Sequence, residues 1–423
     1  MAISDKLNLT NTAWLSCKYT VGMEITFSDK TVRKLQDIQI TGLYLEKDYD
    51  NDHLPVLMID LMLTKLDRNK IDDNTLFHLT IKQYYLDNDD DTVTKRHPKT
   101  YLDDTFVRID FGTQPDTTES LEKKSRDADG LKDGELSTTD LNTQTTYVLV
   151  KRSDLAMTKK FINGVLCDVN MQDTLCWMLT KAGCPNKVLL SNFTNTNTQT
   201  ELLLQPKPLL QQIIFLEQEY GFHKEGTYIF LDFDTFYIIR KNGLPSAWRR
   251  NEPKEVCFCI SDSQSQDSTN NGIILQNNTI YINVGVDQYH MIDASIVEDQ
   301  ISGNNMILFN TTTGKSTIIN SGSKSLDVQG SYTNRMYHGH NPYVESQYKR
   351  MKLENNNIWE ITCLNSDISY FTPQRQFTFL SDTTKISNTL KGNYRISNVK
   401  TTFIKNGNFF NNASTVMVKR VKE

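Results

Sequence analysis

The stretch that decides the fold lies at residues 202–240 and reads LLLQPKPLLQQIIFLEQEYGFHKEGTYIFLDFDTFYIIR. After the PKP motif, apolar residues recur at helical spacing as far as Tyr220, and Gly221 follows. This spacing predicts an amphipathic helix that begins at the prolines, where a missing backbone amide costs little, and ends at the glycine. Two apolar, β-branched and aromatic runs then flank the DFD motif, which predicts two strands.

The acids Asp232 and Asp234 of the DFD motif have two interpretations. Phosphatases of the haloacid dehalogenase type place two aspartates one residue apart after a buried strand, as nucleophile and general acid beside Mg²⁺. That pattern requires a small or β-branched residue two positions after the second acid, where this chain has Phe236, followed by a further strand. A tight turn between two strands, with aspartate favoured for its local hydrogen bonds, explains the motif better. We therefore predict a hairpin and assign no catalytic residue.

Composition limits the class of protein. A chain of 423 residues is too long to fold around one hydrophobic core. Its 18 Tyr and 19 Phe favour aromatic-rich β structure. The net charge of −5 argues against nucleic-acid binding by bulk charge. No run of apolar residues is long enough to span a membrane, and we expect no signal peptide. Seven scattered cysteines indicate reduced thiols rather than a disulfide framework.

Three parts follow from the patterns along the chain. Residues 1–155 contain successive β-rich runs, which predict a first β-barrel-like domain, interrupted at 112–146 by a polar excursion that we expect to be mobile, with a strand resuming at Tyr147. Residues 156–242 predict a small α/β domain, in which Asn170 caps a helix that ends at Gly183. Residues 243–423 are again β-rich and predict a second β-barrel-like domain, with a loop insertion at 330–357. The expected fold class is mainly β with a small α/β domain.

The other candidate metal sites match the known sequence patterns poorly. Residues 87–92 and the alternating acids Asp48, Asp50 and Asp52 fail the EF-hand pattern and are interpreted as solvated turns. Cys257 and Cys259 share one face of a strand, and we expect two buried thiols rather than a metal site.

Three further motifs lie in polar segments. His338 and His340 offer two ligands without an evident third, so a hinge or contact loop is as plausible as a metal site. The motifs at 248–250 and 348–350 combine aromatic and basic residues, as nucleic-acid stacking sites do, but ordinary surface residues are favoured in an acidic chain. We predict no cofactor and no metal.

The order of segments resembles the hub proteins of contractile bacteriophage tails and related injection systems. The first passage that carries the likeness is IQITGLYLEKDYDNDHLPVLMIDLMLTKL at 38–66. The second is FINGVLCDVNMQDTLCWMLTKAG at 161–183 followed by residues 204–239, with their YG stop and FLDFD hairpin. The third is GNYRISNVKTTFIKNGNFFNNASTVMVKRV at 392–421, which looks like the closing strands of a second barrel.

The resemblance implies a non-enzymatic virion protein. Three copies would form a pseudo-sixfold ring, because each chain contributes two similar barrels, and this baseplate hub would join a hexameric tail tube to a trimeric central spike. The implied partners are the tube protein, the spike protein, other baseplate components and the tape measure protein, with DNA passing through the lumen without sequence-specific binding. Assembly in the host cytoplasm is expected. The alternatives are a phosphatase-like enzyme using Asp232 and Asp234, or another multi-barrel component of the tail tip.

Overall fold

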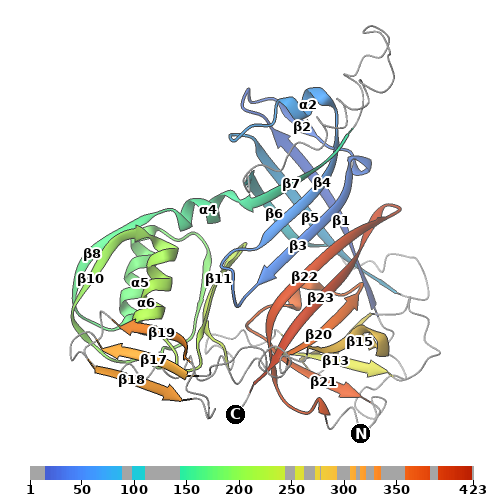
Figure 1. Ribbon diagram of the computed structural model, residues 1–423. Helices are drawn as coiled ribbons and strands as arrows, with labels where there is room; N and C mark the ends of the chain where they lie inside the picture. Colours follow the sequence, from blue (N-terminus) through green and yellow to red (C-terminus); the bar gives the residue numbers. More distant parts are fainter. Residues whose placement is uncertain are drawn as a thin grey trace.

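The computed structural model describes residues 15–87, 98–109, 143–242, 253–261, 272–276, 278–292, 305–310, 315–320, 328–334, 358–381 and 389–421. Strands dominate these residues, and helices concentrate in a smaller part that lies beside them (Figure 1). The predicted fold class, mainly β with a small α/β part, is confirmed.

A first closed circuit of strands joins the two ends of the chain. Its order is β22–β3–β4–β7–β6–β5–β1–β23, and β23 pairs with β22 to close it. The strands are β1 (Leu15–Thr26), β3 (Ile40–Asp48), β4 (Val56–Leu63), β5 (Leu76–Asp87), β6 (Lys99–Arg108), β7 (Thr143–Lys151), β22 (Tyr394–Asn406) and β23 (Phe409–Arg420). The short β2 (Val32–Lys34) pairs with β1, and α2 (Lys65–Asn69) follows β4.

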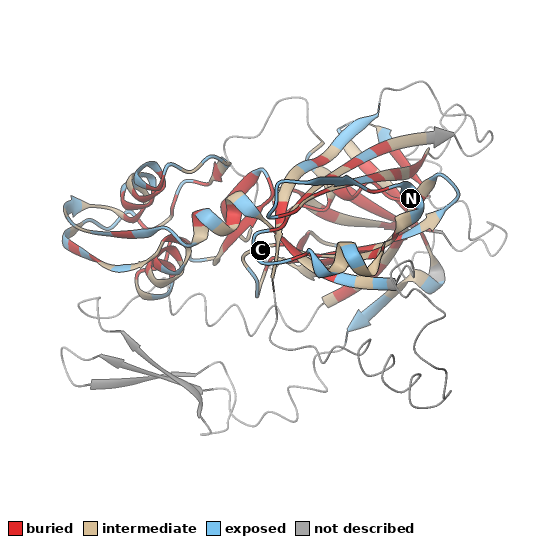
Figure 2. Ribbon diagram, turned by 90° about the horizontal axis from the view of Figure 1, so that it is seen from above, coloured by how far each residue is buried: buried red, intermediate tan, exposed pale blue. Residues whose placement is uncertain are grey.

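Alternation of buried and partly exposed residues, clearest in β4, explains the barrel wall. In β4, Leu57, Ile59, Leu61 and Leu63 are all buried while their neighbours are partly exposed. Successive side chains of a strand point to opposite faces, so one face lines the core and the other faces outward. Figure 2 shows the buried residues along the inner face of this wall. Strand β7 begins at Thr143 rather than at Tyr147, because residues 143–146 already pair with β4.

A second circuit shares three strands with the first. It runs β22–β21–β13–β15–β14–β1–β23, and its β21–β22 and β14–β1 contacts are single pairs, Phe377 with Tyr394 and Leu15 with Ile273. Its further strands are β13 (Glu255–Ser261), β14 (Ile273–Gln276), β15 (Thr279–Gly285) and β21 (Gln376–Ser381). The predicted parts 1–155 and 243–423 therefore share one sheet, and their boundaries stay a prediction.

A separate sheet is formed by the residues between two strands that pair with each other. Strand β16 (Tyr289–Ile292) pairs with β20 (Ile358–Leu364), and the last residue of β16 lies opposite the first of β20. Between them, β17 (Asn305–Asn310), β18 (Lys315–Asn320) and β19 (Val328–Asn334) form a separate three-stranded sheet. Strand β19 extends into the predicted loop insertion at 330–357, and residues 335–357 lie outside the described residues.

The α/β part follows the first barrel strands. It comprises α4 (Arg152–Thr158), β8 (Phe161–Val169), α5 (Met171–Ala182), β9 (Lys187–Leu190), β10 (Gln199–Pro208), α6 (Leu209–Glu219), β11 (Thr227–Asp232) and β12 (Thr235–Arg240). The predicted caps of α5 are confirmed: the Asn170 side chain accepts a hydrogen bond from the Asp173 amide, and Gly183 is left-handed at φ 61°. The predicted helix start near the PKP motif is also confirmed: Pro208 both ends β10 and is the N-cap of α6, which begins at Leu209.

The small sheet β11–β12–β9 is buried on both faces, which explains its unbroken apolar runs. Tyr228 and Phe230 of β11 belong to the barrel core, whereas Ile229 and Leu231 pack with α5 and α6. In β12 the same alternation places Ile239 in the barrel core. The hairpin therefore joins two hydrophobic cores that would otherwise be separate.

We expect Ile239→Ala to lower the free energy of unfolding by about 2–5 kcal/mol, because Ile239 is fully buried between the two parts. The matched control is Ile404→Ala in β22, where the isoleucine is 58% exposed and the cost should stay below about 1 kcal/mol. Urea unfolding followed by circular dichroism measures both. Equal losses in the two variants would show that the hairpin does not bridge the cores.

Candidate functional site

The DFD motif forms the turn of a two-residue hairpin, as predicted. Asp232 pairs with Thr235, so Phe233 and Asp234 are the two central residues. Phe233 has φ 43°, a left-handed conformation that bulky residues rarely adopt. Such a conformation persists where the surrounding structure holds it.

The two acids of the motif do not converge. The Asp232 side chain is buried and faces the barrel, whereas Asp234 is exposed. Within the described ranges, no group of three His, Cys, Asp or Glu residues could hold a metal ion. The phosphatase arrangement requires both carboxylates at one open site, and this geometry does not provide it.

A lysine from the first barrel binds Asp232. Lys47 Nζ lies 2.7 Å from Asp232 Oδ1 and 2.8 Å from Oδ2, and both side chains are nearly inaccessible to solvent. Burial acts to lower the pKa of Lys47, but the Asp232 carboxylate outweighs it and holds the pKa well above its usual range. The Tyr49 hydroxyl donates to the Phe371 carbonyl at 2.9 Å and lies 3.4 Å from Asp232 Oδ2. The acid that resembles a nucleophile is therefore one half of a buried ion pair.

The turn residue Phe233 inserts into the end of the first barrel. Its ring lies 6.1 Å from the Phe106 ring, centroid to centroid, and Lys47 Nζ lies 5.1 Å from its centroid. Its carbonyl accepts hydrogen bonds from Lys151 Nζ at 2.6 Å and Asn186 Nδ2 at 2.8 Å. These contacts hold the unusual backbone conformation.

Asn186 also connects the turn to a buried acid of α4. Its Nδ2 lies 3.3 Å from Oδ1 of Asp154, which is 1% exposed. Burial raises the pKa of Asp154 to about 6, although the Lys151 ammonium acts to lower it.

A second buried ionic cluster surrounds Asp50. Its carboxylate binds Lys241 and Lys419 at 2.7 Å and Arg395 at 2.9 Å, and the Ser397 hydroxyl donates to it at 2.7 Å. Burial acts to raise the pKa of Asp50, but these three cations hold it well below its usual range. The interpretation of Asp50 as a solvated turn residue is therefore wrong, because its side chain is only 7% exposed.

The segment 47–53, KDYDNDH, thus contacts both the α/β part and the closing strands β22 and β23. Lys47 binds the hairpin, and Asp50 binds the closing strands and the residue after β12. His53 Nδ1 lies 2.8 Å from the Ile229 carbonyl, and the His53 carbonyl accepts from the Leu231 amide at 2.9 Å. The partners lie roughly 180 to 370 positions away in sequence, so no local pattern could have identified them. We call segment 47–53 together with Asp232 and Phe233 the junction.

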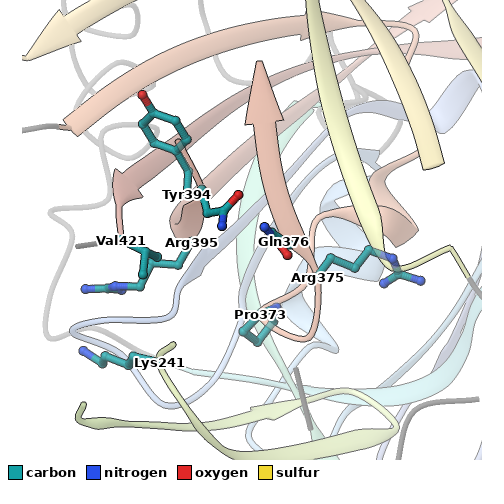
Figure 3. Close-up of a pocket in the computed structure, with 8 residues that line it drawn as sticks. Lys241, Pro373, Arg375, Gln376, Tyr394, Arg395 and Val421 are labelled. Atoms are coloured by element: carbon teal, nitrogen blue, oxygen red, sulfur yellow. The ribbon is translucent and has the colours of Figure 1, made fainter. Parts of the chain in front are cut away.

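A small pocket of about 110 Å³ lies beside the Asp50 cluster (Figure 3). Lys241, Arg375 and Arg395 contribute cationic side chains to its lining. Figure 3 shows Lys241 and Arg395 extending to the same side, where both bind Asp50, while Arg375 points the other way. The Arg375 guanidinium donates to the Thr372 hydroxyl at 2.6 Å and stacks near the Tyr370 ring.

The other predicted residues lie apart from the junction. Cys257 and Cys259 are buried in β13 and pack with Leu380, as expected for small hydrophobic thiols. His338, His340 and the motifs at 248–250 and 348–350 lie outside the described residues, as do residues 88–92. In the part of the chain that the structure describes, no helix is long and apolar enough to cross a membrane.

We expect Lys47→Met to lower the free energy of unfolding by about 3–5 kcal/mol, because Asp232 would remain buried without its partner. The double variant Lys47→Met/Asp232→Leu should recover most of this loss. The matched control is Lys34→Met, which removes an exposed pair with Glu24 and should cost less than about 1 kcal/mol. Urea unfolding of the variants measures the differences, and a Lys47 loss no larger than the Lys34 loss would contradict the role of the pair.

The buried Asp154 carboxyl makes the free energy of unfolding depend on pH. Its pKa of about 6 in the folded state exceeds the ordinary value of about 4, so the folded state binds more protons between these values. The free energy of unfolding should therefore fall by roughly 1–3 kcal/mol as pH rises from 4 to 7 through this group. Asp154→Asn should lose this component and be more stable than the parent at pH 7. Denaturation of both proteins at the two pH values checks it, and identical pH profiles would refute it.

Comparison with solved structures shows which folds resemble that of this chain. The fold is similar to that of the tail protein from Neisseria meningitidis MC58, with 8% identity, a TM-score of 0.51, and coverage of 95% of this chain and 97% of that one. The 43 kDa tail protein of prophage MuSo2 from Shewanella oneidensis aligns over 94% of this chain and 98% of its own, at 9% identity and a TM-score of 0.48. No curated protein matches the sequence.

The fold expected from the resemblance is confirmed by the Neisseria protein, whose likeness extends over both barrel circuits and the α/β part. The family model for the bacteriophage PBS1 gene 109 protein matches residues 9–421. Because this match covers nearly the whole sequence, the chain belongs to the family of the bacteriophage PBS1 gene 109 protein.

Proposed function

We propose that the chain is a non-enzymatic structural protein of a phage tail, and that it forms the hub between the tail tube and the central spike. The observation that carries the proposal is the pair of closed strand circuits that share β1, β22 and β23 within one chain. Membership of a phage family and the fold shared with a tail protein support the same conclusion.

Two circuits per chain make symmetry matching possible. Three copies in a closed ring present six barrel-like units, so one face approximates sixfold symmetry while the assembly keeps threefold symmetry. Such a ring can contact a hexameric tube on one side and a trimeric spike on the other. The tape measure protein and other baseplate components would be further partners, and the assembled hub would belong to the virion after assembly in the host cytoplasm.

The junction supports a mechanical role. Because Lys47 and Asp50 bind partners in both the α/β part and the closing strands, force applied to one part is transmitted to the others through buried contacts. Proteins transmit strain through close-packed interiors, which have low compressibility. The proposed role of the junction is therefore to keep each subunit rigid while the spike seals the ring and later detaches.

A central channel would carry DNA after the spike is released. The formal net charge of −5 is compatible with DNA that slides through without specific binding, because strongly basic walls would retain it. No observation favours the phosphatase alternative, since Asp232 is bound to Lys47 in a buried pair and Asp234 is exposed.

The test is the assembly of the purified full chain. We expect a threefold ring with a central channel in negative-stain images and a mass of three copies by sedimentation. Magnesium-dependent hydrolysis of phosphate monoesters should be absent, and Asp232→Asn/Asp234→Asn should leave that background unchanged. A strict monomer over a wide concentration range, with no ring when the tube and spike proteins are added, would overturn the hub. Magnesium-dependent turnover that the double variant abolishes would favour the enzyme.

A further inference from the structure

Helix α4 connects the first barrel circuit to the α/β part, and it carries the buried acid Asp154 (Figure 1). The helix follows directly after β7. Just beyond it, the Lys160 carbonyl accepts a hydrogen bond at 2.6 Å from the Leu209 amide at the start of α6. Any change in the contacts of Asp154 therefore acts on the connection between the two parts.

Asn186 joins Asp154 to the hairpin turn at Phe233. Its Nδ2 donates to the Phe233 carbonyl at 2.8 Å and lies 3.3 Å from Oδ1 of Asp154. The Ser153 hydroxyl donates to the same Oδ1 at 3.1 Å. Within the described part of the chain, Oδ2 of Asp154 and Oδ1 of Asn186 are buried and have no hydrogen-bond partner. The two side chains are therefore joined by one hydrogen bond and leave two acceptor oxygens unsatisfied.

A proton on Asp154 would satisfy both oxygens at once. A buried acceptor without a donor destabilises the folded state, and an ionised carboxylate is the costlier form to bury. Protonation turns Oδ2 of Asp154 into a donor, and Oδ1 of the adjacent Asn186 side chain is an acceptor. A carboxylic acid and a primary amide are both planar, so they can form two parallel hydrogen bonds in opposite directions. The second of these bonds uses the two oxygens that otherwise have no partner.

Burial raises the pKa of Asp154 to about 6, and charged groups from the elements around α4 modify it. Lys151 of β7 acts to lower this pKa, whereas Asp104 of β6, which binds Lys151 Nζ at 2.9 Å, acts to raise it. The Cys184 thiol after α5 also interacts electrostatically with Asp154. The acids of the other neighbouring elements are Glu217 and Glu219 in the last turn of α6 and the exposed Asp234 of the hairpin turn.

We propose that the protonated Asp154 side chain pairs with the amide group of Asn186, and that this acid–amide pair fastens α4 to the hairpin turn. When Asp154 releases its proton to solvent, the second hydrogen bond is lost and two acceptor oxygens again remain without a donor. The connection between the barrel and the α/β part is therefore tighter in mildly acidic solution and looser above neutral pH. This device is independent of the hub function proposed above.

The first test measures hydrogen–deuterium exchange of the α4 amides by mass spectrometry on the full chain, corrected for the intrinsic effect of pH. Between about pH 5 and about pH 8, the protection of these amides should fall roughly tenfold in the parent. Asp154→Asn should keep its protection at both pH values, because its amide group supplies a permanent donor to Asn186. The matched control is Asp173→Asn, which changes an exposed acid 2.8 Å from Asn170 Nδ2 and should behave as the parent does.

The second test is a double-mutant cycle, which isolates the pairing itself. Asp154→Ala, Asn186→Ala and the double variant give the coupling between the two side chains from the same exchange measurement. We expect a coupling of about threefold or more at about pH 5, and a coupling close to one at about pH 8. Far-UV circular dichroism of each variant verifies the fold. Asn186→Ser, which also lacks the amide group, replaces Asn186→Ala if that variant does not fold.

The two measurements together decide the proposal. A loss of α4 protection that occurs in the parent but not in Asp154→Asn, with a coupling present only in acidic solution, would support the pair. Protection that does not change with pH in the parent, or that still falls in Asp154→Asn, would exclude a proton-dependent contact at this position. A coupling that is equal at both pH values would show that Asp154 acts through its burial alone, and would exclude the pair with Asn186.

Discussion

The buried ion pair between Lys47 and Asp232 is the interaction on which the arrangement of the molecule depends. It joins the end of a barrel strand to the turn of a hairpin that belongs to the α/β part. A buried charge without a partner is strongly destabilising, so each residue requires the other in place. Apolar contacts alone would allow the hairpin to slide, whereas two charges at 2.7 Å fix its position along the barrel. The left-handed turn at Phe233 is the local consequence, because its ring and carbonyl are bound on both sides.

Around that pair, several strands belong to more than one barrel circuit or hydrophobic core. Strands β1, β22 and β23 belong to both circuits, and the sheet β11–β12–β9 belongs to both hydrophobic cores. The Asp50 cluster likewise connects different segments, because one carboxylate binds three cations that come from separate parts of the sequence. Moving one of these parts relative to another would therefore break buried contacts.

Local patterns predicted the local structures well. The cap at Asn170, the glycine stop at Gly183 and the DFD turn follow from short-range hydrogen bonding and backbone preference, and all three are confirmed. The PKP motif also predicted the start of a helix correctly, since Pro208 is the N-cap of α6, but the pairing of the same residues with β8 could not be seen in the local pattern. Asp50 was assigned to a solvated turn, because an acid in a polar run gives no sign of cations that lie far along the chain.

By itself, the sequence determined the mainly β fold class, the helices of the α/β part and the hairpin at the DFD motif. These features depend on periodicity and on interactions within a few residues, so they can be recognised in a short stretch of sequence. The tertiary structure decided that the hairpin enters the barrel, that Asp232 binds Lys47, and that strands from both ends of the chain share one sheet. The physical reason is that ion pairs and strand pairs between residues hundreds of positions apart form only when the folded chain brings their surfaces together. Local conformational preferences do not specify these contacts.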